Sequence, residues 1–113
     1  MKIISEPTSQ KVILKKYNTY FRTMIKCVVD VEKQIIAIDG ELHADLEELL
    51  LENNSSQKNL WGINLYLEKE KENWIEYTAL INIRPSLNNR GMEVESKVIR
   101  DKIKNIIESL IVV

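Results

Sequence analysis

The sequence predicts an α+β fold, with a mainly antiparallel sheet of about four or five strands and two main helices packed on one face. Three observations predict this fold. Apolar residues recur at helical spacing in one segment near the N-terminus and in another at the C-terminus. Between these segments, β-branched runs arrive in neighbouring pairs with short connections, as antiparallel strands do. The length of 113 residues and the hydrophobic content of 44% are those of a single compact domain covering residues 1–113.

The first expected elements are a short strand over residues 2–5 and an amphipathic helix over residues 9–22. Pro7 and the polar pair after it form a typical helix-start signal. From Ile13 to Met24, apolar and aromatic residues follow one another at spacings of three and four, so they share one face of the expected helix.

Two β-branched runs, residues 26–31 and 34–39, predict a hairpin that turns at Glu32-Lys33. Both faces of this hairpin carry apolar residues, which indicates a central position in the sheet. Cys27 lies inside the first run, so we expect a buried structural thiol rather than a reactive one.

The next segment, residues 44–53, changes to helical spacing. Asp45 followed by Glu48 is a capping-box-like start for this helix. The alternative is a strand, because residues 49–51 are three consecutive leucines.

The C-terminal half predicts two more strands and a helix. Strands are expected over residues 61–67 and 74–84, joined by the charged loop 68–73. Pro85 ends the second strand, because proline cannot donate to a ladder. The last helix covers residues 96–110, with a serine at its N-cap and a stripe of apolar residues on its buried face.

The alternation in the second strand pair predicts one apolar face and one polar face. The polar face would carry Asn64, Tyr66, Trp74, Glu76, Thr78, Leu80, Asn82 and Arg84. An open face of this kind could bind a polar ligand or a partner chain, although an antiparallel sheet with one solvated face has the same pattern. Trp61, near a strand start, either covers the core or forms part of a ligand site.

His43, the only histidine of the chain, lies in an alternating row with Asp39, Glu41 and Asp45. If the strand continued through this row, all four side chains would project from one side. An imidazole oriented by a carboxylate suits general-base catalysis, so His43 with Asp45 or Glu41 is the candidate catalytic group. A metal site is not expected, because zinc sites gather more nitrogen or sulfur ligands than one histidine supplies. The alternative is that Asp45 caps a helix and the acids are structural.

The turn after the last expected strand gathers amides and two guanidinium groups. Asn82, Arg84 and Arg90 could hold a carboxylate or phosphate by bidentate hydrogen bonds. The alternative is structural: the asparagines form the turn, and Arg84 pairs with Glu76 or Glu41 across the sheet.

Composition and motifs argue against several protein classes. The net charge of −1 gives no drive toward nucleic acid, and no segment reads as a signal peptide or a membrane span. A single cysteine allows no intrachain disulfide and favours a cytoplasmic location. No phosphate-cradle or hydrolase motif is present, so no cofactor is expected.

Charge is distributed unevenly along the chain. Residues 1–26 have a net charge of +5, residues 27–80 of −8 and residues 81–113 of +2. The acidic middle and the basic flanks should attract each other, either within one molecule or between copies. A homo-oligomer such as a homodimer therefore stays among the expected states.

Four segments occur together in this chain: Val28–Glu32, Leu42-His43-Ala44-Asp45, Trp61-Gly62-Ile63-Asn64 and Leu80-Ile81-Asn82-Ile83-Arg84-Pro85. With them the chain resembles, over nearly its whole length, a small family of prokaryotic domains of unknown function. The resemblance implies one compact domain but brings no established activity, ligand or catalytic residue. It draws attention to His43, Asp45, Trp61, Asn64, Asn82 and Arg84.

The leading hypothesis is a soluble, non-enzymatic binding or protein-interaction domain that uses the polar sheet face. Its partner would be a second copy, another protein or a small anionic ligand, and no nucleic acid or membrane. The candidate binding residues are Trp61, Asn64, Asn82, Arg84 and Arg90. The alternative is a small enzyme with His43 as general base and Arg84 as the anchor for an anionic substrate.

Overall fold

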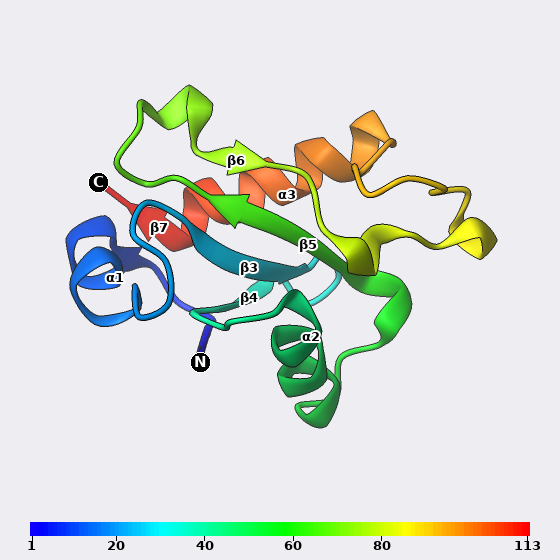
Figure 1. Cartoon of the computed structure of the whole chain (residues 1–113), viewed down its shortest axis with the longest axis horizontal. Coiled ribbons are helices and arrows are strands. Elements are labelled where there is room, and N and C mark those ends of the chain that lie inside the picture. Colours follow the sequence, from blue (N-terminus) through cyan, green and yellow to red (C-terminus); the bar gives the residue numbers. More distant parts are fainter.

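A five-stranded antiparallel sheet forms the centre of the computed structural model, which describes all 113 residues. The strand order is β1-β4-β3-β5-β6 (Figure 1). The strands are β1 (Lys2–Ile4), β3 (Ile25–Asp30), β4 (Ile35–Ile38), β5 (Leu60–Leu65) and β6 (Ile75–Glu76). A second, small sheet pairs β2 (Thr8–Ser9) with β7 (Ile111–Val112) in parallel. The predicted α+β class is confirmed.

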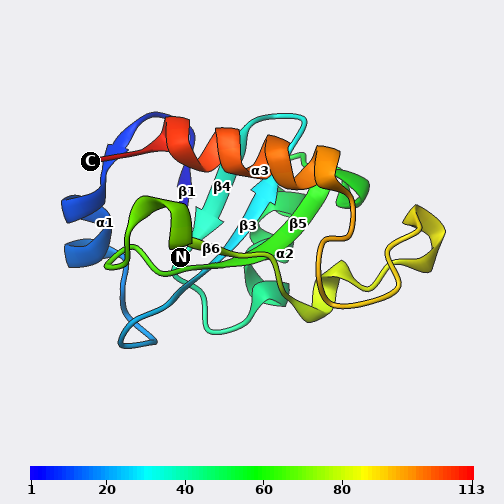
Figure 2. The same ribbon diagram turned by 90° about the horizontal axis from the view of Figure 1, so that it is seen from above.

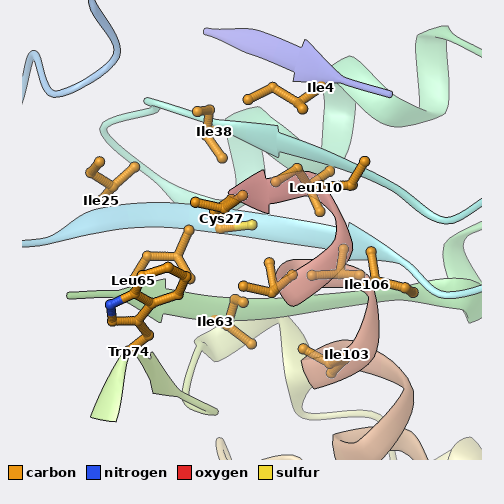
Figure 3. Packing of buried hydrophobic residues seen from close by; sticks show 14 of the residues in the cluster. Ile4, Ile25, Cys27, Ile38, Ile63, Leu65, Trp74, Ile103, Ile106 and Leu110 are labelled. Atoms are coloured by element: carbon orange, nitrogen blue, oxygen red, sulfur yellow. The ribbon is translucent and has the colours of Figure 1, made fainter. Parts of the chain in front are cut away.

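The larger hydrophobic core lies between one face of the sheet and α3 (Lys97–Leu110), which runs across that face (Figure 2). The helix begins after Ser96, whose side chain caps it as the sequence predicts. Ile103 and Leu110 belong to the same cluster as Cys27 of β3 (Figure 3). Cys27 is fully buried, as the sequence predicts, and burial raises the pKa of its thiol.

The N-terminal helix packs on the same core but is shorter than predicted. α1 (Gln10–Lys16) reaches the core through Ile13, and the expected continuation to residue 22 is wrong. Beyond the helix, the Asp39 carboxylate accepts hydrogen bonds from the Thr19 backbone N–H at 2.9 Å and from the Thr19 hydroxyl at 2.7 Å. These two bonds tie the chain to the end of β4, so the helix ends early.

The opposite face of the sheet is covered in part by α2 (His43–Glu52) (Figure 2). Leu46 and Leu50 of this helix form a smaller core with Val28, Ala37 and Leu60. The helix predicted over residues 44–53 is confirmed, but Asp45 lies in its first turn and does not cap it. The expectation that this face of the sheet is open is therefore wrong over the α2 contact. None of the helices has the length and apolar composition needed to cross a membrane.

The predicted hairpin between β3 and β4 is present, but its turn is longer than the two residues expected. Asp30, fully buried, organises it: its Oδ1 accepts from the N–H groups of Glu32 and Lys33, each at 2.9 Å. Its Oδ2 accepts from the Ser55 hydroxyl at 2.6 Å. Gln34 closes the turn with a φ of 57°, so the left-handed position follows the predicted turn pair.

The strand predicted over residues 74–84 is wrong beyond its start, because β6 ends at Glu76. Trp74, expected on the polar face, is 2% exposed and packs in the larger core. The chain then leaves the sheet and forms the 3₁₀ turn η3 (Leu80–Asn82). Asn82 Oδ1 accepts from the Gly62 N–H at 2.8 Å, and Asn82 Nδ2 donates to the Gly62 carbonyl at 2.9 Å. The side-chain amide of Asn82 thus makes the two hydrogen bonds to β5 that the backbone of a neighbouring strand would make.

The segment after η3 projects from the body of the molecule (Figures 1 and 2). Its base is held by Asn89, which is 3% exposed and donates through Nδ2 to the carbonyls of Asn82, Gly91 and Glu93 at 2.8–3.0 Å. The short 3₁₀ turns of the chain, besides η3, are η1 (Gln57–Asn59), η2 (Lys71–Asn73) and η4 (Pro85–Leu87).

Candidate functional site

The uncovered end of the α2 face contains a pocket of about 480 Å³, which we call the α2 pocket. Its apolar lining consists of Met24, Leu42, Ala44, Ala79, Leu80, Ile81 and Met92. Its polar lining consists of Lys26, His43, Asn64 and Thr78. Ligand sites in proteins are typically apolar cavities of about 300–1,000 Å³ with a few convergent polar groups. The α2 pocket has this form.

Asn64, on β5, is the most buried polar side chain of the pocket, with 8% exposure. Its Nδ2 donates to Glu76 Oε1 at 2.7 Å and to the Thr78 carbonyl at 3.3 Å. Both partners are acceptors, so they fix which end of the amide is the nitrogen. The oxygen must then face away from them, and Oδ1 is buried without a hydrogen-bond partner.

His43, the first residue of α2, lies beside Asn64 and lines the same pocket. Its Nε2 is 2.8 Å from the Ile63 carbonyl oxygen, which can only accept, so Nε2 carries the proton. Burial lowers the pKa of His43 below its ordinary value of 6.5, and the positive charge of Lys26 lowers it further. The Ile63 carbonyl and the Asn64 amide oppose burial without offsetting it. The ring is therefore neutral at pH 7, with Nδ1 as an acceptor.

The buried state of His43 predicts that stability decreases in mild acid. The unfolded chain protonates His43 near pH 6.5, whereas the folded protein does so only at lower pH. Stability is therefore complete above pH 6.5 and decreases as the pH falls toward the folded pKa. Urea unfolding measured between about pH 7.5 and pH 5.5 should show this decrease, because the imidazole of the unfolded chain takes up its proton in this range.

His43→Gln is the control, since glutamine can still donate to the Ile63 carbonyl but does not titrate. The difference in unfolding free energy between wild type and this variant should shrink as the pH falls. Because the chain has one histidine, its ring proton resonances also report the pKa without ambiguity. Equal pH profiles for the two proteins, or a ring pKa at or above 6.5, would contradict the assignment.

Positive groups also reach the α2 pocket. No side chain caps α2 at Leu42, and its first backbone bonds run from the Asp45 and Leu46 N–H groups to the Leu42 carbonyl. The N–H groups of His43 and Ala44 are thus left without an acceptor in the chain. Lys26, paired in register with Asn64, takes part in none of the ion pairs. Its ammonium lies 5.1 Å from the centre of the Phe21 ring.

The predicted row of acids around His43 does not form. β4 ends at Ile38, and Asp39 takes a φ of 64°, so the chain turns before Glu41. Asp39 binds Thr19, and neither Glu41 nor Asp45 lines the α2 pocket. The catalytic role of His43 with one of these acids stays a prediction that its surroundings do not favour. The structure contains no group of three metal-ligating side chains.

Trp61 and Arg84 lie together outside the α2 pocket. The Arg84 guanidinium carbon is 5.4 Å from the centre of the Trp61 ring, and its Nη2 is 2.7 Å from Glu47 Oε2. Its Nη1 donates to the Leu60 carbonyl. Glu47 is thus the partner of Arg84, in place of the expected Glu76 or Glu41. Arg84 and Glu47 line a second cavity of about 510 Å³. The binding role predicted for Trp61 and Arg84 stays a prediction, and the guanidinium already has three partners within the fold.

Asn82 and Arg90 are placed very differently from each other. Asn82 is 0% exposed, and its side-chain amide hydrogen-bonds both backbone groups of Gly62. Its Nδ2 also donates to the Met92 carbonyl at 3.0 Å. Arg90 is exposed on the projecting segment, where its backbone N–H donates to Glu95 Oε2 at 2.7 Å. The structure therefore does not bring the two together with Arg84 around one anion.

Sequence reasoning found His43 and Asn64 but missed Lys26 and the apolar rim. Leu42, Leu80 and Met92 are 54%, 72% and 42% exposed, respectively, and all three line the α2 pocket. A usable signal for Lys26 was its place in an otherwise apolar strand, directly before Cys27. The rim carried no such signal, because its members come together only through tertiary structure.

Comparison with known protein families identifies the family to which the chain belongs. The model of the family described as "Protein of unknown function (DUF5674)" matches residues 2–110, so the chain belongs to this family. No curated protein and no solved structure matches the chain.

Proposed function

We propose that this member of the DUF5674 family is a ligand-binding module and that its ligand occupies the α2 pocket. One observation carries the proposal: Asn64 lines the pocket, and its Oδ1 is buried without a hydrogen-bond partner while the His43 ring is neutral. A buried polar group without a partner costs about 1–3 kcal/mol. An N–H or O–H group of a ligand that reaches Oδ1 would remove this cost, so we expect the pocket to favour a ligand with a hydrogen-bond donor.

The rim of the pocket supports an apolar body for the same ligand. Leu42, Leu80 and Met92 are exposed large apolar side chains gathered around one opening. Apolar side chains gathered around the opening of a cavity are typical of ligand sites. The ligand class is therefore a molecule with an apolar group and at least one donor.

The enzyme alternative has less support. It needs His43 and Arg84 around one substrate, but these residues line different cavities, with Leu80 and Ile81 between them. His43 also has no carboxylate beside it that could orient the ring as a general base. A binding module is the better-supported function of the two.

The proposal is tested with N-acetyl-L-leucinamide, which has an apolar side chain and N–H donors, in a ¹H–¹⁵N NMR titration. We expect shifts concentrated at Lys26, His43, Asn64 and Met92. An analogue of the probe with all amide nitrogens methylated keeps the apolar group but has no donor. It should bind at least about tenfold more weakly, because Asn64 Oδ1 stays unsatisfied.

Two variants with equal charge changes locate the binding. Leu80→Glu puts a charge on the rim of the pocket at a residue that is 72% exposed, and should weaken binding about tenfold. Val98→Glu, at a residue 65% exposed on α3, is the control and should bind as wild type does. Shifts scattered over the surface, or equal binding by both variants, would overturn the proposal.

A further inference from the structure

We infer that the chain binds a second copy of itself through two helices of opposite charge, α1 of one molecule against α2 of the other. Each helix presents an exposed stripe of side chains. The α1 stripe consists of Val12, Lys15 and Lys16, and the α2 stripe consists of Glu48, Leu51 and Glu52. None of these residues lines the α2 pocket, so this contact is separate from the proposed ligand site.

Each of the two helices carries ionic charge of one sign only. α1 contains no acidic residue, and its basic residues are Lys11, Lys15 and Lys16. α2 contains no lysine or arginine, and its acidic residues are Asp45, Glu47, Glu48 and Glu52. Among all these side chains, only Glu47 has an ionic partner in the protein, namely Arg84. The charges of both stripes are therefore unneutralised.

The fold keeps the two stripes from meeting within one molecule. α1 packs on the larger core through Ile13, whereas α2 packs on the smaller core across the sheet through Leu46 and Leu50. The helices lie apart in both views (Figures 1 and 2). The loop 68–73 begins close to α1, because Gln10 Nε2 donates to the Leu67 carbonyl, but it forms no ion pair with α1. The attraction between the basic N-terminal region and the acidic middle is thus left for a contact between copies.

Each stripe also has an apolar residue among its charges. Val12 is 38% exposed and shares a helix face with Lys15 and Lys16, three and four positions further on. Leu51 is 40% exposed and lies three positions after Glu48 and beside Glu52. An apolar centre with a polar rim is typical of protein interfaces, and rims of opposite charge select the partner.

The last turn of α2 needs a cation that its own molecule does not supply. A helix C-terminus favours positive charge because of the helix dipole, yet this turn contains Glu52 and no basic residue. Lys33 donates to the Asn53 carbonyl at 3.4 Å but pairs with no carboxylate. The α1 stripe of a second copy would bring Lys15 and Lys16 to this end.

Charge reversal tests the contact by sedimentation velocity up to about 1 mM protein, where weak association is populated. We expect weak, reversible self-association at low salt, because two short helices bury less area than a stable interface. It should weaken about tenfold between about 0.05 and 0.5 M salt, which screens exposed charges. Lys15→Glu/Lys16→Glu and Glu48→Lys/Glu52→Lys should each weaken it at least about tenfold, because like charges then face each other.

Combining the two pairs of changes should restore association. The fourfold variant has the net charge of the wild type and again carries stripes of opposite sign. An equimolar mixture of the two pair variants should associate too, because each molecule then meets a partner of opposite charge. Lys102→Glu/Lys104→Glu, at exposed residues of α3, is the control, since it changes net charge as the α1 variant does and should associate as the wild type does.

Three results would overturn the inference. The first is a wild type that stays monomeric at about 1 mM in low salt, where weak association would be visible. The second is association of the pair variants equal to that of the wild type. The third is a mixture of the pair variants that stays monomeric although circular dichroism shows both folded. If the monomeric wild type instead binds a poly-L-glutamate peptide at α1, the α1 stripe takes a foreign acidic chain and not a second copy.

Discussion

Replacing Asn82 with alanine is expected to lower the free energy of unfolding by about 3–5 kcal/mol, one of the largest effects of any polar substitution in the chain. The buried amide satisfies the Gly62 N–H, the Gly62 carbonyl and the Met92 carbonyl. Alanine leaves the N–H and the carbonyl of Gly62 without a partner, and each costs about 1–3 kcal/mol when it is buried. The Met92 carbonyl loses one of two partners, because the Ala79 N–H still donates to it at 3.1 Å. Urea unfolding followed by circular dichroism measures the loss.

Asn105→Ala is the matched control, because Asn105 is exposed on α3 and alanine favours a helix. We expect it to change stability by less than about 0.5 kcal/mol. A similar small change for Asn82→Ala would show that the amide does not take the place of a strand beside β5. Loss of pocket binding in a fully stable Asn82→Ala protein would point instead to the ligand role that the sequence predicts.

Gly62→Ala is expected to cost about 1–3 kcal/mol through overpacking. A Cβ atom at Gly62 would lie 2.5 Å from Ala79 Cβ, 3.1 Å from Ile81 Cγ1 and 3.2 Å from His43 Cδ2. The first distance is too short for two carbon atoms, so η3 must move off β5. Because the His43 ring must shift too, its proton resonances should change along with the stability.

A double variant tests whether the clash with Ala79 causes the loss of stability in Gly62→Ala. Ala79→Gly removes the atom that clashes most, so Gly62→Ala/Ala79→Gly should be more stable than the sum of the single changes predicts, by about 1 kcal/mol. Gly91→Ala is the control, because its Cβ would meet nothing within 4 Å and its φ is not positive. If the effects of Gly62→Ala and Ala79→Gly on stability are strictly additive, the clash with Ala79 is not the reason why position 62 requires glycine.

The parts of the fold that could be predicted are those whose signals are local. α3 has both its N-cap, Ser96, and its apolar stripe within one segment, and the hairpin β3–β4 has its strands next to each other in sequence. The position of α2 on the second face had no local signal in the sequence, although Val28 and Ala37 indicated that something covers this face. They make the hairpin apolar on both faces, as a sheet covered on both sides requires.

The prediction of a strand up to residue 84 was wrong because an alternating pattern of apolar and polar residues does not reveal which strand a segment pairs with. Residues from Thr78 onward keep the alternating pattern, yet the bonds that a strand backbone would make to β5 come from the Asn82 side chain. The candidate site shows the same limit. His43 and Asn64 were conspicuous residue types, whereas the partner of Arg84 depended on where α2 places Glu47.

The side-chain pairing along β5 also bears on aggregation. An edge strand normally offers unpaired N–H and C=O groups to which another chain can add. Along β5 beyond β6, the Leu60 carbonyl is taken by Arg84, and both backbone groups of Gly62 are taken by Asn82. Two side chains thus close this edge to strand addition without a sixth strand. The projecting segment can therefore change in length and sequence without opening this edge of β5, as long as Asn82 and Arg84 are kept.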